Sequence, residues 1–232
     1  MTEAEWLGCE HPPTMLETLW KRSRATERKL RLLDCECCRH IWHLLNDPRS
    51  RRAVESAEQY TEGRIDRQML ERAAVEARAA IRHARPESDA AEFAAATAAM
   101  FAARAAAEAV SWDGLHRTSA AAAMAAGAVS SPDDWEPSKH SEEVWQSGVL
   151  RDIFGNPFRT VTVNPEWLSW NGGTIRKIAQ ASYDDRAFDR MPILADALED
   201  AGCTDADILD HCRGAGPHVR GCWVVDLLLG KE

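Results

Sequence analysis

Cysteine and histidine gather near both ends of this chain, at spacings that could hold a metal ion. Near the C-terminus they are His211, Cys212, His218 and Cys222, two pairs on either side of the glycine-rich turn 214–217. If the residues beyond this turn are helical, His218 and Cys222 are i, i+4 neighbours on one face. Thiolate and imidazole are ligands that zinc prefers, and four of them complete its tetrahedron. The C-terminal group is therefore a candidate zinc site.

A second group lies near the N-terminus, within a helix that we expect over residues 26–45. Its members are Cys35, Cys37, Cys38, His40 and His43. Cys35 and Cys38 are i, i+3 neighbours and could both point toward one ion, alone or in a composite site with the C-terminal group. The spacing is not that of paired Cys-x-x-Cys knuckles. The simpler interpretation, which we prefer for both groups, is that the cysteines are small buried core residues.

Catalysis by these residues has less support than metal binding. Cys222 could act as a nucleophile with His218 as base and Asp226 to orient it, because a thiolate needs a nearby histidine. Three such residues on one helix provide neither oxyanion donors nor a substrate cleft. The turn 214–217 lacks the Lys-Ser/Thr of a phosphate loop. The sequence therefore favours a protein that is not an enzyme.

Basic residues crowd the first third of the chain. Residues 20–85 contain 16 Lys and Arg against 10 Asp and Glu, although the whole chain has a net charge of -9. Such a segment could follow a nucleic-acid backbone. The pI near 5.4 and the lack of a recognition-helix or RNA-platform motif argue against it. We expect instead a solvated helix face on which acidic residues alternate with the basic ones.

The elements that carry these residues are predicted to be helices throughout. Apolar residues recur every three or four positions over 26–45. Asp47-Pro48 caps the next helix, Asp66 caps a fourth, and an alanine-rich tract over 73–128 favours closely packed helices. Later helices are expected over 174–183, 191–201 closed by Gly202, from Thr204 onward, and over 219–229. Residues 160–163 resemble a strand but are expected to be an extended connector.

These elements predict an all-α protein in three parts. Residues 1–130 form an alanine-rich helical bundle, 131–165 a tryptophan-rich irregular connector, and 166–232 a C-terminal helical module packed on the bundle. The chain has nine tryptophans. Those in and beside the connector either anchor loops on the bundle or offer a surface to a partner.

Several phrases of the chain resemble an uncharacterised family of proteins abundant in planctomycete bacteria. They are MTEAEWL (1–7), CCRHIW (37–42), RDIFGNPFR (151–159), LADALEDAGC (194–203) and HVRGCWVVD (218–226). The resemblance implies a bacterial origin. It implies no activity and no catalytic residue.

The leading hypothesis from the sequence is a non-enzymatic protein-interaction or scaffold module that binds another protein. The first alternative is a zinc-binding protein that uses Cys35, Cys38, His211, Cys212, His218 and Cys222 from both ends of the chain. The second is nucleic-acid binding through residues 20–85. The chain lacks a long apolar run and a signal-like N-terminus, and its odd number of cysteines suits a reducing compartment, so we expect the cytoplasm and no membrane.

Overall fold

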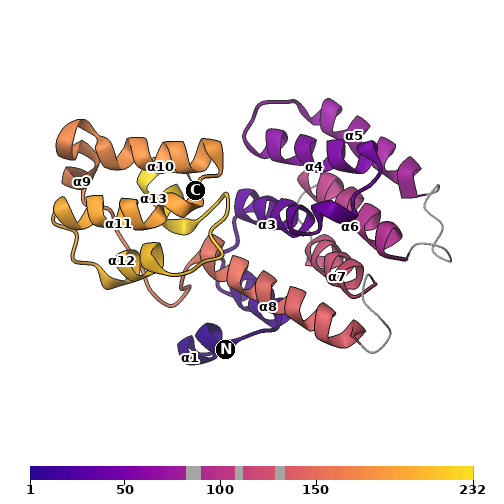
Figure 1. The fold of residues 1–232 in the computed structure, drawn as a ribbon, viewed down its shortest axis with the longest axis horizontal. Helices are drawn as coiled ribbons and strands as arrows, with labels where there is room; N and C mark the ends of the chain where they lie inside the picture. Colours follow the sequence, from indigo (N-terminus) through magenta and orange to yellow (C-terminus); the bar gives the residue numbers. More distant parts are fainter. Residues whose placement is uncertain (82–89, 108–111, 129–133, 232) are drawn as a thin grey trace. The chain divides into compact units, whose positions relative to one another are not determined.

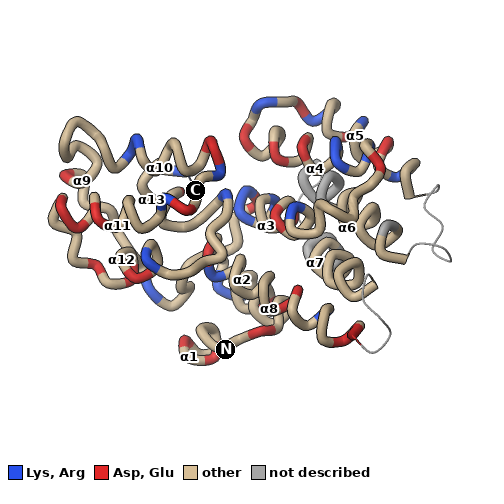
Figure 2. Tube along the Cα trace, in the orientation of Figure 1, with Lys and Arg blue, Asp and Glu red and all other residues tan. Residues whose placement is uncertain are grey.

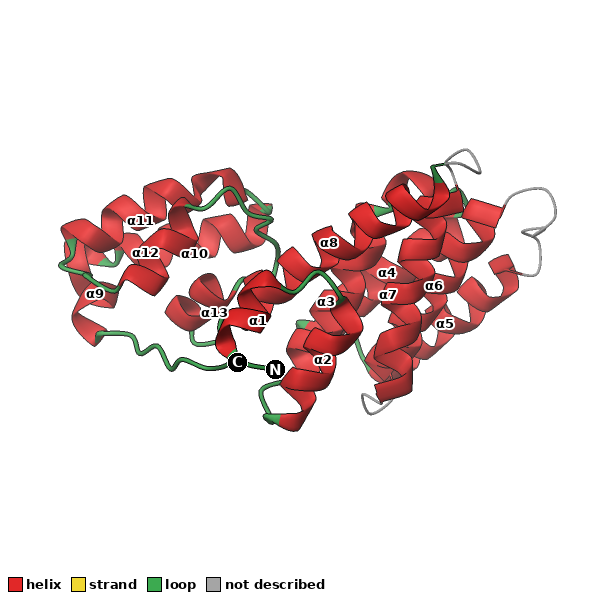
Figure 3. Cartoon of the chain, turned by 90° about the horizontal axis from the view of Figure 1, so that it is seen from below, coloured by secondary structure: helices red, strands yellow, loops and turns green. Residues whose placement is uncertain are grey.

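The computed structural model describes residues 1–81, 90–107, 112–128 and 134–231. The all-α prediction is confirmed: within these ranges every regular element is a helix and no strand occurs (Figures 1 and 3). The chain forms two compact units. We call Cys9–Ser147 the bundle unit, and Met1–Gly8 together with Gly148–Glu232 the terminal unit, because it contains both ends of the chain.

The bundle unit is built from helices α2 to α7 and most of α8. Their bounds are α2 Pro12–Lys21, α3 Glu27–His40, α4 Pro48–Thr61, α5 Arg67–Ile81, α6 Ala90–Ala107, α7 Trp112–Ala128 and α8 Trp135–Phe154. Helix α6 packs against α7, α5 and α4. Ala95, Ala98, Ala99, Ala122 and Ala125 are fully buried in this unit, which is consistent with the close approach that small side chains allow.

Helices α4 and α5 begin directly after the capping residues that were predicted from the sequence. The side chain of Asp47 accepts a hydrogen bond from the backbone N–H of Arg49, and that of Asp66 accepts one from Met69. Helix α3 ends earlier than predicted, at His40, and residues Trp42–Leu44 form a 3-10 turn. Asn46 and Asp47 therefore follow a short turn and not a continuous helix.

The terminal unit packs short helices around its own core. They are α1 Glu3–Gly8, α9 Pro165–Ser169, α10 Thr174–Asp185, α11 Met191–Asp200, α12 Ala206–Arg213 and α13 Trp223–Leu229, with the end of α8. Helix α10 packs against α11 and α13, and α11 packs against α12. Gly202 ends α11 in the left-handed conformation, as predicted. Asp205, and not Thr204, caps α12, because its carboxylate accepts from two backbone N–H groups.

The segment predicted as an irregular connector is largely one helix. Helix α8 covers 20 residues and continues through the division between the two units at Ser147 and Gly148. Residues 160–163 are extended without forming a strand, as expected. The boundary predicted at residues 130–131 lies outside the described residues. Trp135, Trp145 and Trp170 are half-buried and Trp167 is buried, so these tryptophans pack within the protein.

No described helix has the length and the apolar character that crossing a membrane would require.

Asp34 makes the bundle unit less stable as pH rises. It lies on α3 with only 2% of its surface exposed, and its Oδ1 atom has no hydrogen-bond partner among the described residues. Burial raises its pKa well above 3.8. The unfolded chain therefore releases this proton at lower pH than the folded chain, and stability falls as pH rises above about 4.

We expect Asp34→Asn to raise the melting temperature at pH 7 by about 2–4 °C, the shift that ~1 kcal/mol produces in a chain of this size. The gain should be smaller at pH 5, and thermal melts between pH 5 and 8 measure it. Asp66→Asn makes the same change at an exposed helix cap and is the control. A lower melting temperature of Asp34→Asn at pH 8 would contradict the argument.

Candidate metal centre

Four side chains of the terminal unit bring their ligand atoms to one point. They belong to Asp152, His211, His218 and Cys222, and one ligand atom from each lies within 4.8 Å of the others. The side chains of Asp152 and His218 are 2% and 9% exposed, that of His211 is 18% exposed, and Cys222 is fully buried. In the described ranges no other group of His, Cys, Asp and Glu converges in this way.

Each of the four residues comes from a different element. Asp152 lies in the last turn of α8, and His211 lies in the last turn of α12. Cys222 is the residue before α13, and His218 lies on the loop between α12 and α13. A bond to one ion at this point would therefore join four segments of the terminal unit.

Three glycines allow the loop to reach the end of α8. A methyl group at Gly148 would come within 2.9 Å of the Cδ atom of Pro217, and one at Gly216 within 2.8 Å of the backbone nitrogen of His218. Gly216 and Gly221 also have φ angles of 87° and 97°, which favour glycine. Gly221 thus separates His218 from α13, so the predicted helix over 219–229 begins only at Trp223.

The contacts of His218 bear on its protonation state beside Asp152. Its Nε2 atom lies 3.2 Å from the carbonyl oxygen of Gly214, and its Nδ1 atom lies 2.9 Å from Oδ1 of Asp152. A carbonyl oxygen only accepts, so this contact is a hydrogen bond when Nε2 carries the hydrogen. In a neutral imidazole Nδ1 then presents a lone pair to a carboxylate, which also only accepts. The contact is favourable only when a second ring proton or a metal ion lies between the two atoms.

Without a metal, a proton takes this position. Burial lowers the pKa of His218, but the hydrogen bond and negative charge of Asp152 outweigh burial, and the pKa is raised above 6.5. Burial also opposes ionisation of Asp152, yet hydrogen bonds to His211 and His218 and their charges give it a lowered pKa. Below the raised pKa of His218 the metal-free pair is therefore an imidazolium and a carboxylate.

His211 and Cys222 complete the cluster. The Nε2 atom of His211 lies 3.1 Å from Oδ1 of Asp152 and 3.2 Å from Sγ of Cys222. Burial, and then the charge of Asp152, raise the pKa of Cys222 well above 9, so the metal-free side chain is a thiol, and the hydrogen bond of His211 Nε2 goes to Asp152. A bound cation would instead lower the pKa of Cys222, because a coordinating thiol loses its proton.

The spacing of the ligand atoms suits a tetrahedral ion. Zinc bonds of about 2.0–2.3 Å at tetrahedral angles place neighbouring ligand atoms roughly 3.3–3.6 Å apart. The three ligand contacts here measure 2.9, 3.1 and 3.2 Å. The other pairs among the four ligand atoms lie within 4.8 Å, so a tetrahedral zinc ion would draw the longer pairs together and move these three slightly apart.

The other predicted ligands lie elsewhere. Cys212 follows His211 in α12, but it is buried in the core of the terminal unit, and burial and the charge of Asp152 raise its pKa to about 12. Cys35 and Cys38 are fully buried on α3, in the bundle unit. Burial raises their pKa values well above 9, which fits the interpretation of these cysteines as core residues.

The histidines of the N-terminal group have other surroundings. His40 makes a short contact through Nδ1 with the buried carboxylate of Glu142, and its ring stacks on Trp145 with centroids 3.7 Å apart. His43 is exposed. The prediction that this group holds a metal is therefore not supported by any convergence of its ligand atoms in the described structure.

Asp152 is not among the ligands predicted from the sequence. Residue 226, the predicted carboxylate partner of His218, lies on α13, and the carboxylate that contacts His218 is that of Asp152. Asp152 stands 59 positions before His211 and has no local motif. The only indication is its apolar surroundings. Leu150 and Ile153 beside it are fully buried, and an aspartate in such surroundings usually has a charged partner.

Many basic residues of the bundle unit are paired with acidic ones. Arg39 donates two hydrogen bonds to Glu58, at 2.8 and 2.7 Å. Further pairs join Arg28 to Glu62, Arg31 to Glu27, Arg49 to Asp47, Arg52 to Glu76 and Arg67 to Glu71. Basic and acidic positions alternate along α3, α4 and α5 (Figure 2). The expected solvated face is present only in part, because Asp34, Glu36 and Glu58 are buried and the carboxylate of Glu62 is 7% exposed.

In comparisons with known proteins, the chain matches no family model, no curated protein and no solved structure. The resemblance to planctomycete proteins stays a prediction, and the function must be argued from the site.

Proposed function

We propose that this protein binds one zinc ion through Asp152, His211, His218 and Cys222, and that the ion holds the terminal unit together. The observation that carries the proposal is the arrangement of His218. When Nε2 donates its hydrogen to the Gly214 carbonyl, the Nδ1 atom faces a carboxylate oxygen, and either a second ring proton or a metal ion makes this contact favourable. Two further ligand atoms, one nitrogen and one sulfur, lie around the same point.

The ligand set favours zinc over other common metals. Magnesium and calcium prefer oxygen ligands alone, whereas two imidazoles, one thiolate and one carboxylate suit zinc. Four protein ligands close the tetrahedron, which is typical of structural sites and leaves no position for a catalytic water. The protein would then use the ion for stability and not for chemistry.

The surroundings of the ligands also resemble those of metal sites. Metal-binding histidines usually donate their second ring N–H to a carbonyl or carboxylate, as His218 does to Gly214. Metal-binding carboxylates are likewise hydrogen-bonded, and Oδ2 of Asp152 accepts from the backbone N–H of Val219 at 2.9 Å. These contacts would hold both ligands in the orientation that the ion needs.

A cytoplasmic location is part of this proposal. All seven cysteines lie in the described ranges, and none forms a disulfide there. A reducing compartment keeps the Cys222 thiol available as a ligand. Protein interaction and nucleic-acid binding, the other hypotheses from the sequence, stay predictions without a supporting surface in the described structure.

Elemental analysis and cobalt substitution test the proposal. Untagged protein purified under reducing conditions should contain about one zinc per chain, the stoichiometry of a four-ligand site. Protein stripped of metal and titrated with Co²⁺ should gain the visible bands of a tetrahedral ion and a thiolate-to-cobalt charge-transfer band. Failure of the stripped, reduced protein to bind either Zn²⁺ or Co²⁺ would overturn the proposal.

A further inference from the structure

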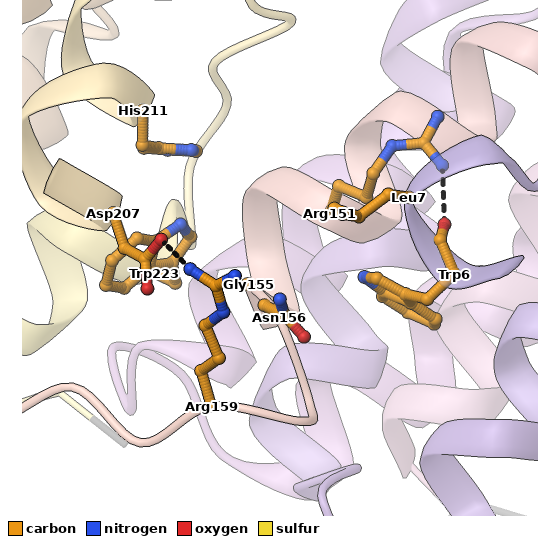
Figure 4. Close-up of a pocket in the computed structure, with 9 residues that line it drawn as sticks. All are labelled: Trp6, Leu7, Arg151, Gly155, Asn156, Arg159, Asp207, His211 and Trp223. Atoms are coloured by element: carbon orange, nitrogen blue, oxygen red, sulfur yellow. Dashed lines mark hydrogen bonds and ion pairs between the residues drawn. The ribbon is translucent and has the colours of Figure 1, made fainter. Parts of the chain in front are cut away.

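A cavity of about 260 Å³ lies in the terminal unit beside the metal centre. Its wall comes from α1, from α8 and the turn that follows it, from α12 and from α13 (Figure 4). Leu7 in this wall is 55% exposed, so the cavity opens to solvent. Of the four candidate ligands, His211 alone belongs to the wall. The cavity therefore approaches the metal centre on the side of one imidazole ring.

The candidate ligands differ in how easily each could leave the cluster. Asp152 is almost fully buried, and Cys222 is fully buried directly before α13. His218 is little more exposed, and its Nε2 atom lies 3.2 Å from the carbonyl oxygen of Gly214. The side chain of His211 is the most exposed of the four, and the cavity lies beside it. In a close-packed interior the other three can leave only when their neighbours move, whereas His211 borders a space that already exists.

One arginine connects two parts of the cavity wall. The Nε atom of Arg159 donates to Oε1 of Glu3 on α1, and its Nη1 atom donates to Oδ1 of Asp207 on α12, both at 2.6 Å (Figure 4). We call these two contacts the Arg159 bridge. Asp207 stands four residues before His211, so the two lie on one face of α12. The bridge therefore attaches the face of α12 that carries His211 to α1.

The Arg159 bridge is exposed and can open while the unit stays folded. The side chains of Arg159, Glu3 and Asp207 are 51%, 36% and 37% exposed. Exposed ion pairs contribute little to stability, and salt screens them. The apolar face of α12 stays buried in the core of the unit when the bridge opens. Its opening is therefore a local event that frees only the side of α12 next to the cavity.

We propose that the metal ion enters and leaves its site through this cavity, past His211, and that the Arg159 bridge limits the rate of both steps. The inference rests on the proposed zinc site and adds how the ion exchanges with solution. The bridge is present in the metal-free and the metal-bound protein alike, and it must open for either step. Its loss should therefore speed binding and release by the same factor and leave the affinity unchanged.

Zinc exchange of the full-length protein measures both rates. Release is followed by mixing zinc-loaded protein with a chelating dye, at dye concentrations above which the rate no longer changes, and binding by mixing reduced, metal-free protein with Zn²⁺. Arg159→Gln should raise both rates about three- to tenfold, the factor that two exposed ion pairs can supply. Arg213→Gln is the matched control, because Arg213 lies on the same helix, pairs with Glu199 and Asp196, and is not part of the cavity wall. It should exchange zinc like the parent protein.

A double-mutant cycle separates the bridge from a general loosening of the unit. Glu3→Gln should also speed exchange, and Glu3→Gln combined with Arg159→Gln should speed it no more than Arg159→Gln alone, because both changes break one contact. Equal rates in Arg159→Gln and Arg213→Gln overturn the inference, and so does a release rate that rises while the binding rate does not.

Zinc content, measured on the same samples, keeps this test apart from that of the metal centre. A parent protein that binds no zinc overturns the metal proposal and this inference with it. One zinc per chain, with exchange rates that Arg159→Gln leaves unchanged, overturns the inference alone.

Discussion

Cys222→Ser protein, reduced and exposed to zinc, should retain almost none of the metal that the parent protein binds. The substitution removes the single sulfur ligand, and a serine hydroxyl is a much poorer ligand for zinc than a thiolate. Loss of an outer-shell partner alone weakens metal affinity by about 10–100-fold, so loss of a direct ligand should weaken it by more than about 100-fold. Competition with a chelating dye measures the affinity, and elemental analysis measures the content.

The chain provides matched controls for this result. Cys212→Ser makes the same change ten positions earlier, at a buried cysteine of the same unit that does not belong to the cluster. It should lower stability through lost packing but keep one zinc per chain, and Cys38→Ser in the bundle unit should do the same. Asp152→Asn should reduce affinity like Cys222→Ser. If Cys212→Ser or Cys38→Ser released the metal and Cys222→Ser did not, the assignment of ligands would be wrong.

The sequence was a better guide to the helices than to the metal centre. Caps such as Asp47 and Asp66 and the left-handed Gly202 act through neighbours a few positions away, so their effect can be predicted locally. The length of α8 could not be predicted in the same way. Pro137 made the start of this helix look like part of a connector, yet Pro137 lies in the first turn, where proline fits a helix.

The four candidate ligands also differ in whether nearby residues in the sequence allow them to be predicted. His211, His218 and Cys222 were identified because they lie within twelve residues of one another. Asp152 joins them only through tertiary structure, where Gly148 lets the loop at Pro217 approach α8. The predicted i, i+4 relation of His218 and Cys222 was wrong, because Gly221 adopts a positive φ and the residues converge through a loop. Local spacing therefore drew attention to three residues that do converge, although not through the predicted helical relation.

Removal of zinc should unfold the terminal unit at a lower temperature while the bundle unit stays folded. The four ligands join α8, α12, α13 and the loop between the last two, so their release frees segments that share a small core. A loss of about 2–4 kcal/mol, well below the binding energy of structural zinc, lowers the midpoint of a unit of this size by roughly 10–20 °C. Thermal melts with and without a chelator measure the size of the effect. Hydrogen exchange of α12, α13 and α4 shows where in the protein it occurs.

The size of this effect should depend on pH. The pKa of His218 is raised in the metal-free fold, so its pairing with Asp152 contributes stability below about 6.5, the unfolded value, and this contribution is lost as pH rises through the folded pKa. The lowered pKa of Asp152 acts in the same pair, and its contribution is present above about 3.8. Near pH 6 a proton therefore replaces the ion in part. At pH 8 a proton does not replace the ion, and zinc binds more tightly because its ligands are deprotonated.

Chelation should accordingly lower the melting temperature more at pH 8 than at pH 6. A larger effect at pH 6, or loss of exchange protection in α4 rather than in α12 and α13, would show that the cluster does not hold the ion that stabilises this unit.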